Sequence, residues 1–282
     1  MIVSFHPLFE ADKNIICAGR EPDAKDLAAI KAARAVVLPQ GCRRSLYEMA
    51  RNNCDLVFPN YKARFDFPGK IGQIRLFRET NTAHPQTRLY PSVADFDQNR
   101  GENPVDIPFA LPCVFKFDWG GEGETVYKIN CLSDLKEMLC KAAGFENSGQ
   151  KGFLLQQFVA AKGKTLRVVI IGRTMVSYWR IQQDRDEFMS SVSRGARIDS
   201  ASQPEQQKAA RALVDDFCRK TGINLAGFDV IFSSEGESLR PLLLEINYFF
   251  GRKGLGGSDA YYGILKKEIH NWLVNALSGQ DK

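Results

Sequence analysis

Residues 241–257, PLLLEINYFFGRKGLGG, place a carboxylate and an amide inside an apolar run. Such a run is typical of a buried strand. Because a strand alternates its faces, it should direct three side chains to each side, with Leu242, Leu244 and Ile246 on one and Leu243, Glu245 and Asn247 on the other. A buried charge costs free energy unless a cation or a hydrogen-bond donor pairs with it. The stretch therefore predicts a partner for Glu245.

A second apolar strand with a single carboxylate precedes this stretch. Residues 225–232, LAGFDVIF, contain Asp229, and the SSEGES that follows is typical of a turn. A hairpin that is symmetric about this turn brings Asp229 opposite or diagonal to Glu245 on the same face. Two carboxylates and the Asn247 amide would then converge, and magnesium prefers such oxygen donors. The alternative is that Glu245 only forms a salt bridge with a neighbouring Arg or Lys.

The composition is that of a globular protein with two domains or three small ones: 282 residues, 44% hydrophobic and 25% charged. The net charge of +5 is spread along the chain without a basic run, so we expect an anionic substrate and no nucleic-acid partner. The seven cysteines include no CxxC pair, which favours reduced thiols in a cytoplasmic protein. We find no signal-peptide pattern and no apolar run long enough to cross a membrane.

Strand and helix patterns divide the chain into three parts. Residues 1–62 alternate strands and helices, which predicts an α/β domain with a parallel sheet. Residues 63–150 and 151–282 are predicted to form two α+β parts, because their strands follow one another through short turns. In these two parts we expect helices over residues 70–79, 132–143 and 203–222, strands that include residues 190–198, and a loop over residues 95–106.

Residues 115–127, FKFDWGGEGETVY, join two predicted strands through a glycine-rich turn. Three glycines there would let backbone amides approach an anion and let the loop move as a lid: Gly120, Gly121 and Gly123. A glycine hairpin is by itself usually only a hairpin, and the stretch matches neither GxxxxGK[ST] nor GxGxxG. Lys116 adds a stronger signal, because a lysine in an apolar strand needs an anion.

Three arginines follow at or beside predicted strands, namely Arg167, Arg180 and Arg194. Guanidinium groups bind phosphate or carboxylate through paired donors. Each arginine alone is more typical of a solvated surface. Together with the carboxylates of the hairpin, they indicate a substrate with several negative charges.

The order of these motifs resembles the ATP-grasp superfamily, in the branch of the ribosomal-protein glutamate ligases and bacterial glutathione synthetases. The resemblance is strongest over residues 70–257 and most specific in the hairpin, where the family has D, then E-x-N before a proline- or glycine-rich loop. It implies an ATP-grasp fold, with a small N-terminal α/β domain and two α+β subdomains that clasp ATP.

The resemblance also implies a role for each matching residue. Lys116 and, less closely, Lys70 would bind ATP phosphates, with the three glycines as a lid. The adenine would be held by backbone contacts at a hinge formed by Gln156, Gln157 and Phe158. Magnesium, as two ions with manganese as an alternative, would be held by Asp229, Glu245 and Asn247. The acyl substrate and the transferring phosphate would meet Arg167, Arg180 and Arg194.

Three positions depart from the family pattern. Gln157 stands where close relatives have glutamate, Thr165 where they have an aspartate near the ribose, and Ser191 where they have the asparagine of N-x-x-R-G. The hinge contact is mostly made by the backbone, so Gln157 should still permit adenine binding. The departures at Thr165 and Ser191 suggest a divergent subfamily with its own substrate.

The resemblance predicts an ATP-dependent carboxylate–amine ligase that forms an amide or peptide bond through an acyl phosphate. The expected partners are small-molecule or peptide substrates, with no nucleic acid and no membrane, and a homo-oligomer is compatible with the sequence. No protein nucleophile is needed, and three histidines lie outside every motif: His6, His84 and His270. Two alternatives stay open, namely a phosphotransferase without an amine acceptor and a non-catalytic nucleotide-binding module.

Overall fold

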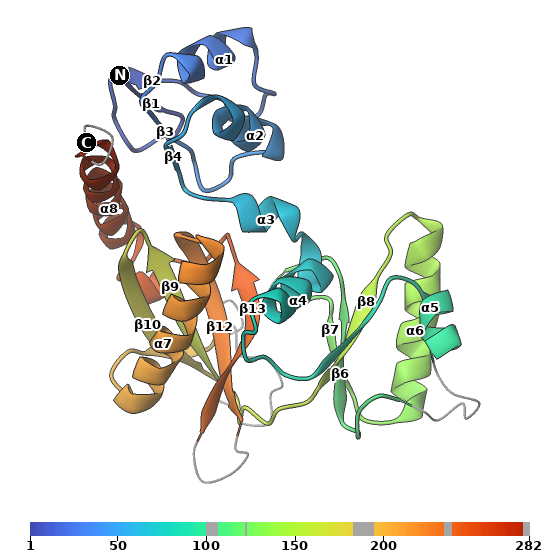
Figure 1. The fold of residues 1–282 in the computed structure, drawn as a ribbon. Helices are drawn as coiled ribbons and strands as arrows, with labels where there is room; N and C mark the ends of the chain where they lie inside the picture. Colours follow the sequence, from blue (N-terminus) through green and yellow to red (C-terminus); the bar gives the residue numbers. More distant parts are fainter. Residues whose placement is uncertain (100–106, 122, 183–194, 234–238, 279–282) are drawn as a thin grey trace.

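The computed structural model describes residues 1–99, 107–121, 123–182, 195–233 and 239–278 (Figure 1). The first part holds a four-stranded parallel sheet in the order β2-β1-β3-β4. This confirms the α/β prediction for the start of the chain. Its elements are β1 (Ile2–Ser4), β2 (Lys13–Asn14), α1 (Ala24–Lys31), β3 (Ala35–Val37), α2 (Arg44–Asn53) and β4 (Val57–Phe58).

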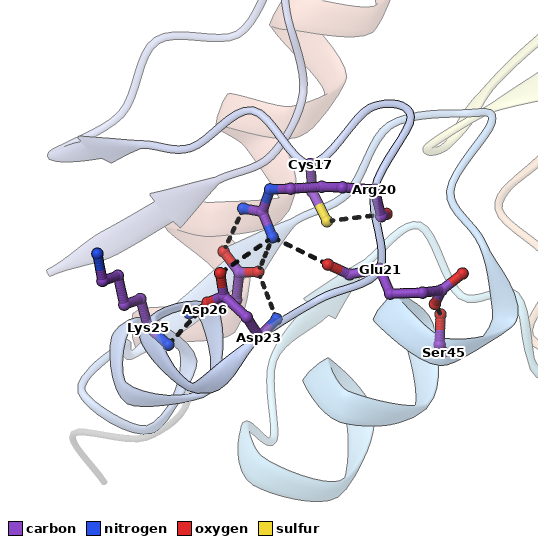
Figure 2. A network of polar contacts seen from close by, with 7 residues as sticks. All are labelled: Cys17, Arg20, Glu21, Asp23, Lys25, Asp26 and Ser45. Carbon is purple, nitrogen blue, oxygen red and sulfur yellow. Dashed lines mark hydrogen bonds and ion pairs between the residues drawn. The ribbon is translucent and has the colours of Figure 1, made fainter.

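A polar network fixes the loop between β2 and α1 in this domain (Figure 2). The Asp23 side chain accepts hydrogen bonds from the first backbone amides of α1 and so caps the helix. The Asp26 carboxylate is buried and accepts two hydrogen bonds from the Arg20 guanidinium, one of them 2.8 Å long. Arg20 also donates to the carbonyl of Glu21. The buried Asp26 carboxylate thus has an arginine partner close by in the sequence.

The second sheet is antiparallel and has the order β5-β8-β6-β7. Helix α6 packs against β6 and β7, as Figure 1 shows, and α5 lies beside it. The elements are β5 (Thr87–Tyr90), α5 (Val93–Asn99), β6 (Cys113–Phe117), β7 (Val126–Ile129), α6 (Leu132–Asn147) and β8 (Phe153–Gln157). Strand β8 follows residue 150 but pairs with β5 and β6. The second sheet therefore extends to Gln157.

The predicted loop over residues 95–106 was wrong at its start, where residues 95–99 are helical. The side chain of Ser92 accepts a hydrogen bond from the Asp95 amide, and Phe96 is buried against Tyr90 and Phe153. A polar sequence becomes helical here because one aromatic side chain anchors it to the sheet.

The third sheet is antiparallel, in the order β11-β10-β9-β12-β13. Helices α4 and α7 cover one face, and α8 covers part of the other, where it also meets the N-terminal sheet. The predicted helices over 70–79 and 203–222 are confirmed, whereas the strand expected to include 190–198 is seen only from residue 197 and is not described before residue 195. The elements are α3 (Lys62–Asp66), α4 (Gly69–Glu79), β9 (Lys164–Ile171), β10 (Thr174–Ile181), β11 (Arg197–Asp199), α7 (Pro204–Thr221), β12 (Leu225–Ser233), β13 (Arg240–Asn247) and α8 (Ser258–Ser278).

The hairpin of β12 and β13 has the predicted pairing but an irregular register. Asp229 pairs with Glu245, and Val230 pairs with Leu243, so Leu244 has no partner across the ladder. This bulge puts Leu243 and Ile246 into the same core, under α4 and α7. Simple alternation was therefore wrong for Leu243, although it correctly places Glu245 and Asn247 on one face.

Candidate active site

One face of the third sheet changes from apolar to polar along its length. Under α8 it presents Val169, Ile171 and Leu225 to the core. Cross-strand partners lie on the same face. Beyond α8, the same face therefore carries polar groups. They come from the cross-strand pairs Arg167–Asp229, Asp229–Glu245 and Tyr178–Arg167.

Asp229 lies at the centre of these polar groups. Its Oδ1 atom is 2.6 Å from Arg167 Nε and 2.8 Å from Arg180 Nη2, and its Oδ2 atom accepts a 3.3 Å hydrogen bond from Asn247 Nδ2. Burial favours the neutral acid, but Arg167 and Arg180 hold the pKa of Asp229 below its ordinary value. Arg180 also donates two hydrogen bonds to Thr165 Oγ1, of 3.1 and 2.9 Å. The threonine that departs from the family pattern thus orients Arg180.

Glu245 is beside Asp229 but has no comparable partner. Within the described residues it forms no ion pair and accepts no hydrogen bond. Burial and the charge of Asp229 raise its pKa, while Lys116, Lys70 and Arg167 act in the opposite direction. None of the arginines and lysines in the described parts of the chain forms the simple salt bridge with Glu245 that the alternative requires.

These donors fit a hard cation. The carboxylate oxygens of Glu245 accept no hydrogen bond from the described residues, and the Asn247 amide and the Asp229 carboxylate lie on the same face. Magnesium is bound by one or two carboxylates together with substrate oxygens and water. The roles of the three residues as ligands remain a prediction.

Lys116 approaches the site from β6 of the second sheet. Burial lowers its pKa to about 8, while its electrostatic neighbours are Glu245, Lys70 and Asp229. The second and third sheets therefore face each other across these groups. Within the described residues, Lys116 donates no hydrogen bond, so a buried ammonium faces an uncompensated carboxylate.

Lys70 is bound to the glycine turn. Its Nζ atom donates to the carbonyls of Trp119, at 2.8 Å, and Gly120, at 3.0 Å, and to Thr125 Oγ1, at 3.3 Å. Gly120 has a φ of +81°, and a Cβ atom there would lie 2.5 Å from the Thr125 methyl. Gly123 also has positive φ, at +80°, whereas Gly121 is exposed. The tight turn thus requires glycine at two of the three predicted positions.

The predicted adenine hinge lies at the end of β8. The Gln157 amide donates to the carbonyl of Gln86 at 2.8 Å. The Gln156 side chain is buried and donates to Thr87 Oγ1, so its amide group is already used inside the second sheet. The Phe158 ring lies 4.7 Å from Lys128 Nζ on β7. Their contacts with a nucleotide remain predictions, and Arg194 and Ser191 lie outside the described residues.

Sequence reasoning missed two groups that shape the site. The Asp118 carboxylate accepts a hydrogen bond from the Ile71 amide at 2.6 Å, which fixes the start of α4 against the end of β6. Tyr178 shares the polar face with Arg167 and Asp229, and Gly254 packs so closely on its ring that a Cβ atom would lie 2.1 Å from Cζ. The FKFD run hinted at Asp118, whereas no local pattern marked Tyr178.

Two facing sheets, with Lys116 and a glycine turn on one, carboxylates on the other and Lys70 of α4 bound to the turn, define an ATP-grasp protein. Residues 70–273 match the RimK-like ATP-grasp domain, and the chain belongs to this family. A similar solved structure is the RimK domain protein ATP-grasp from Sphaerobacter thermophilus, with a TM-score of 0.59 and 14% identity, covering 95% of this chain and 98% of that one. The L-amino acid ligase from Bacillus licheniformis has a TM-score of 0.55 and 12% identity, covering 87% and 58%.

Curated relatives are more similar in sequence over a shorter stretch. The probable alpha-L-glutamate ligase of Stenotrophomonas maltophilia is 31% identical over 173 residues, 58% of this chain and 54% of that protein. The protein of the same name from Picosynechococcus is 31% identical over 189 residues, 66% and 57% of the two chains. The chain spans about half the length of the curated relatives that it matches.

Proposed function

We propose that the protein is an ATP-dependent carboxylate–amine ligase. The observation that supports it most is Glu245, a carboxylate without an ion pair among the described residues, which faces Lys116 of the second sheet and Lys70 of α4. The names of the relatives and of the Bacillus licheniformis structure agree with this activity. The γ-phosphoryl group of ATP would pass to a substrate carboxylate, and an amine would displace phosphate from the resulting acyl phosphate.

In this proposal the second sheet binds the nucleotide. Lys116 would bind phosphate oxygens, and its buried ammonium would gain the anion that it lacks. Lys70 would exchange the carbonyls of Trp119 and Gly120 for phosphate, which would release the glycine lid. The backbone of Gln157 and Phe158 would hold the adenine.

The third sheet would hold the metal and the reacting groups. Glu245, Asp229 and Asn247 would hold one or two magnesium ions, or manganese, and such ions neutralise phosphate charge. Arg167 and Arg180 are buried and oriented by Asp229 and Thr165 before any substrate binds. Donors fixed in this way stabilise negative charge that develops during phosphoryl transfer without having to reorganise.

The test is ADP release from ATP and magnesium over a panel of amino acids and short peptides, with Glu245→Gln as the control for contaminating activity. A ligase incorporates the amine into the product, which mass spectrometry detects. A phosphorylated product without amine would instead support a phosphotransferase. No ADP release above the Glu245→Gln background with any substrate would contradict the proposed activity.

Two further properties belong to this proposal. No helix in the described parts of the chain is long and apolar enough to cross a membrane. We propose a cytoplasmic protein that acts on small-molecule or peptide substrates, with a homo-oligomeric state as a further hypothesis. Light scattering of the purified chain measures the oligomeric state directly.

A further inference from the structure

A side chain of α4 binds the free edge of β13, the last strand of the third sheet. The Ile246 amide donates a hydrogen bond to Gln73 Oε1 at 2.8 Å, and Gln73 Nε2 donates to the carbonyl of Ile246 at 2.9 Å. In an antiparallel ladder a residue directs its amide and its carbonyl to the same side, so Ile246 turns both away from β12. Gln73 thus takes the place of a neighbouring strand at this one residue.

Ile246 lies between two of the predicted metal ligands, Glu245 and Asn247. The ladder is irregular just before them, because Leu244 has no partner on β12, and a bulge of this kind disrupts local pairing. The Glu245 carboxylate accepts no hydrogen bond within the described residues, so no bond of its own holds it in place. The backbone therefore sets where the Glu245 side chain points, and Gln73 fixes that backbone.

The first turn of α4 is bound to the second sheet. Lys70 is three residues before Gln73, so the two side chains are neighbours on the helix surface. The Lys70 Nζ atom donates to the carbonyls of the glycine turn, and the Lys70 amide donates to the carbonyl of Asp118 at 3.1 Å. One helix therefore joins the turn after β6 to the strand that carries Glu245.

We infer that Gln73 is a positioning residue for the metal site. The inference rests on the proposed function, in which Glu245 and Asn247 help to hold the cation. Gln73 acts through the backbone of Ile246 and keeps the two flanking side chains aimed at one point. Loss of a residue that orients metal ligands typically weakens metal binding by about 10- to 100-fold. Removing both hydrogen bonds of Gln73 should therefore weaken cation binding in a protein that is still folded.

Two glutamine-to-methionine variants test this role. Gln73→Met removes both hydrogen bonds at nearly constant side-chain length, and Gln207→Met on α7 is the matched control. Gln207 is buried on the same face of the sheet, accepts a hydrogen bond from Ser177 Oγ at 2.7 Å and donates to the carbonyls of Ser200 and Ser202. Manganese alone is titrated into the full chain, and electron paramagnetic resonance measures the free ion. We expect its Kd to rise at least about tenfold in Gln73→Met and to stay within about twofold in Gln207→Met.

The effect of Glu245→Gln, which removes a ligand, is the reference for these titrations. If Glu245→Gln loses manganese binding but Gln73→Met keeps it, or if both methionine variants lose it equally, the role of Gln73 is wrong. If Glu245→Gln binds manganese like the wild type, the metal site is wrong as well.

A second variant covers a failure of Gln73→Met to fold, which thermal unfolding detects. Gln73→Asn is neutral but one methylene too short to keep both hydrogen bonds, so it should weaken manganese binding in the same direction. Unchanged binding in folded Gln73→Asn would contradict the inference. Because no ATP or substrate is present, an absence of ADP release would contradict the proposed ligase activity alone.

Discussion

Two buried aspartates in this protein are each bound by arginine, yet only one belongs to the candidate active site. Asp26 in the N-terminal domain is 1% exposed and Asp229 in the third sheet is 7% exposed. Arg20 pairs with the Asp26 carboxylate, and the Asp23 side chain caps the helix beside it (Figure 2). Beside Asp229, in contrast, Glu245 has raised pKa and Lys116 has lowered pKa. A buried arginine–aspartate pair therefore does not by itself indicate an active site. The shifted pKa values of Glu245 and Lys116 do indicate one.

Of the variants compared here, Glu245→Gln should have the largest effect on turnover. Turnover should fall by about 10³-fold or more, because the uncharged amide no longer holds the metal. Without metal, the variant should unfold at the same temperature as the wild type or higher, since repulsion from Asp229 is removed. The raised pKa of Glu245 means that wild-type stability declines as pH rises from the unfolded value, about 4.3, through the folded pKa, and the variant should lack this decline.

Metal-free thermal unfolding and turnover of both proteins measure this prediction. A metal-free loss of about 3 to 5 kcal/mol in Glu245→Gln would be the signature of a broken structural salt bridge. That result would argue against the metal site.

Arg180→Ala should lower turnover by about 10²-fold while ATP affinity changes little, because we expect its interaction to strengthen during phosphoryl transfer. Arg167→Ala should act in the same direction with a smaller effect. Arg197→Ala removes an exposed arginine on β11 and is the matched control. Steady-state kinetics and nucleotide titration separate the two quantities. A loss of ATP affinity as large as the loss of turnover would assign Arg180 to nucleotide binding instead.

Lys116→Ala should remove most of the stabilisation by ATP and magnesium. At a hundredfold excess over Kd, this stabilisation is about 2.7 kcal/mol for the wild type. Thermal unfolding with and without nucleotide measures it, with Lys136→Ala, at an exposed lysine of α6, as a comparison for general charge loss. An unchanged nucleotide response in Lys116→Ala would remove Lys116 from the site.

The pH dependence of ATP binding is a second test of the role of Lys116. Since burial lowers the pKa of Lys116 to about 8, the ammonium should lose its proton as pH rises above that value. Phosphate favours the charged form, so affinity should decline by up to about tenfold per pH unit above pH 8, until the pKa of the bound state is reached. Titrations from pH 7 to 9.5 measure the decline. The same slope in Lys116→Ala would point to another group, such as Lys70.

Asp26→Asn should have the smallest effect, and only on stability. The change weakens a charged hydrogen-bond pair by about 1 kcal/mol, because solvent screens the half-exposed Arg20. Turnover and the ATP-induced stabilisation should stay within about twofold of the wild type. Urea unfolding and steady-state assays measure both. A large loss of turnover at unchanged folding would mean that the N-terminal network takes part in the site.

Local patterns in the sequence predicted much of this architecture. The two-residue period of β12 and β13, with its embedded acids, correctly paired Asp229 with Glu245. The helices α4 and α7 were found because they have helical periodicity and clear ends. Helix α5 was missed, since its anchor Phe96 has its partners on β5 and β8. The bulge at Leu244 was missed because packing in the core under α4 and α7, rather than the strand pattern itself, sets which side chains turn inward.

The sequence by itself determined which residue types are available and on which local elements they lie: a lysine in one apolar strand, acids in another, and glycines at a turn. Only the tertiary structure decided how these charges are shared. Both arginines bind Asp229 and leave Glu245 to face Lys116, from a strand more than a hundred residues away in the chain. The physical reason is that a Coulomb interaction depends on separation and on the surrounding dielectric, and packing sets both.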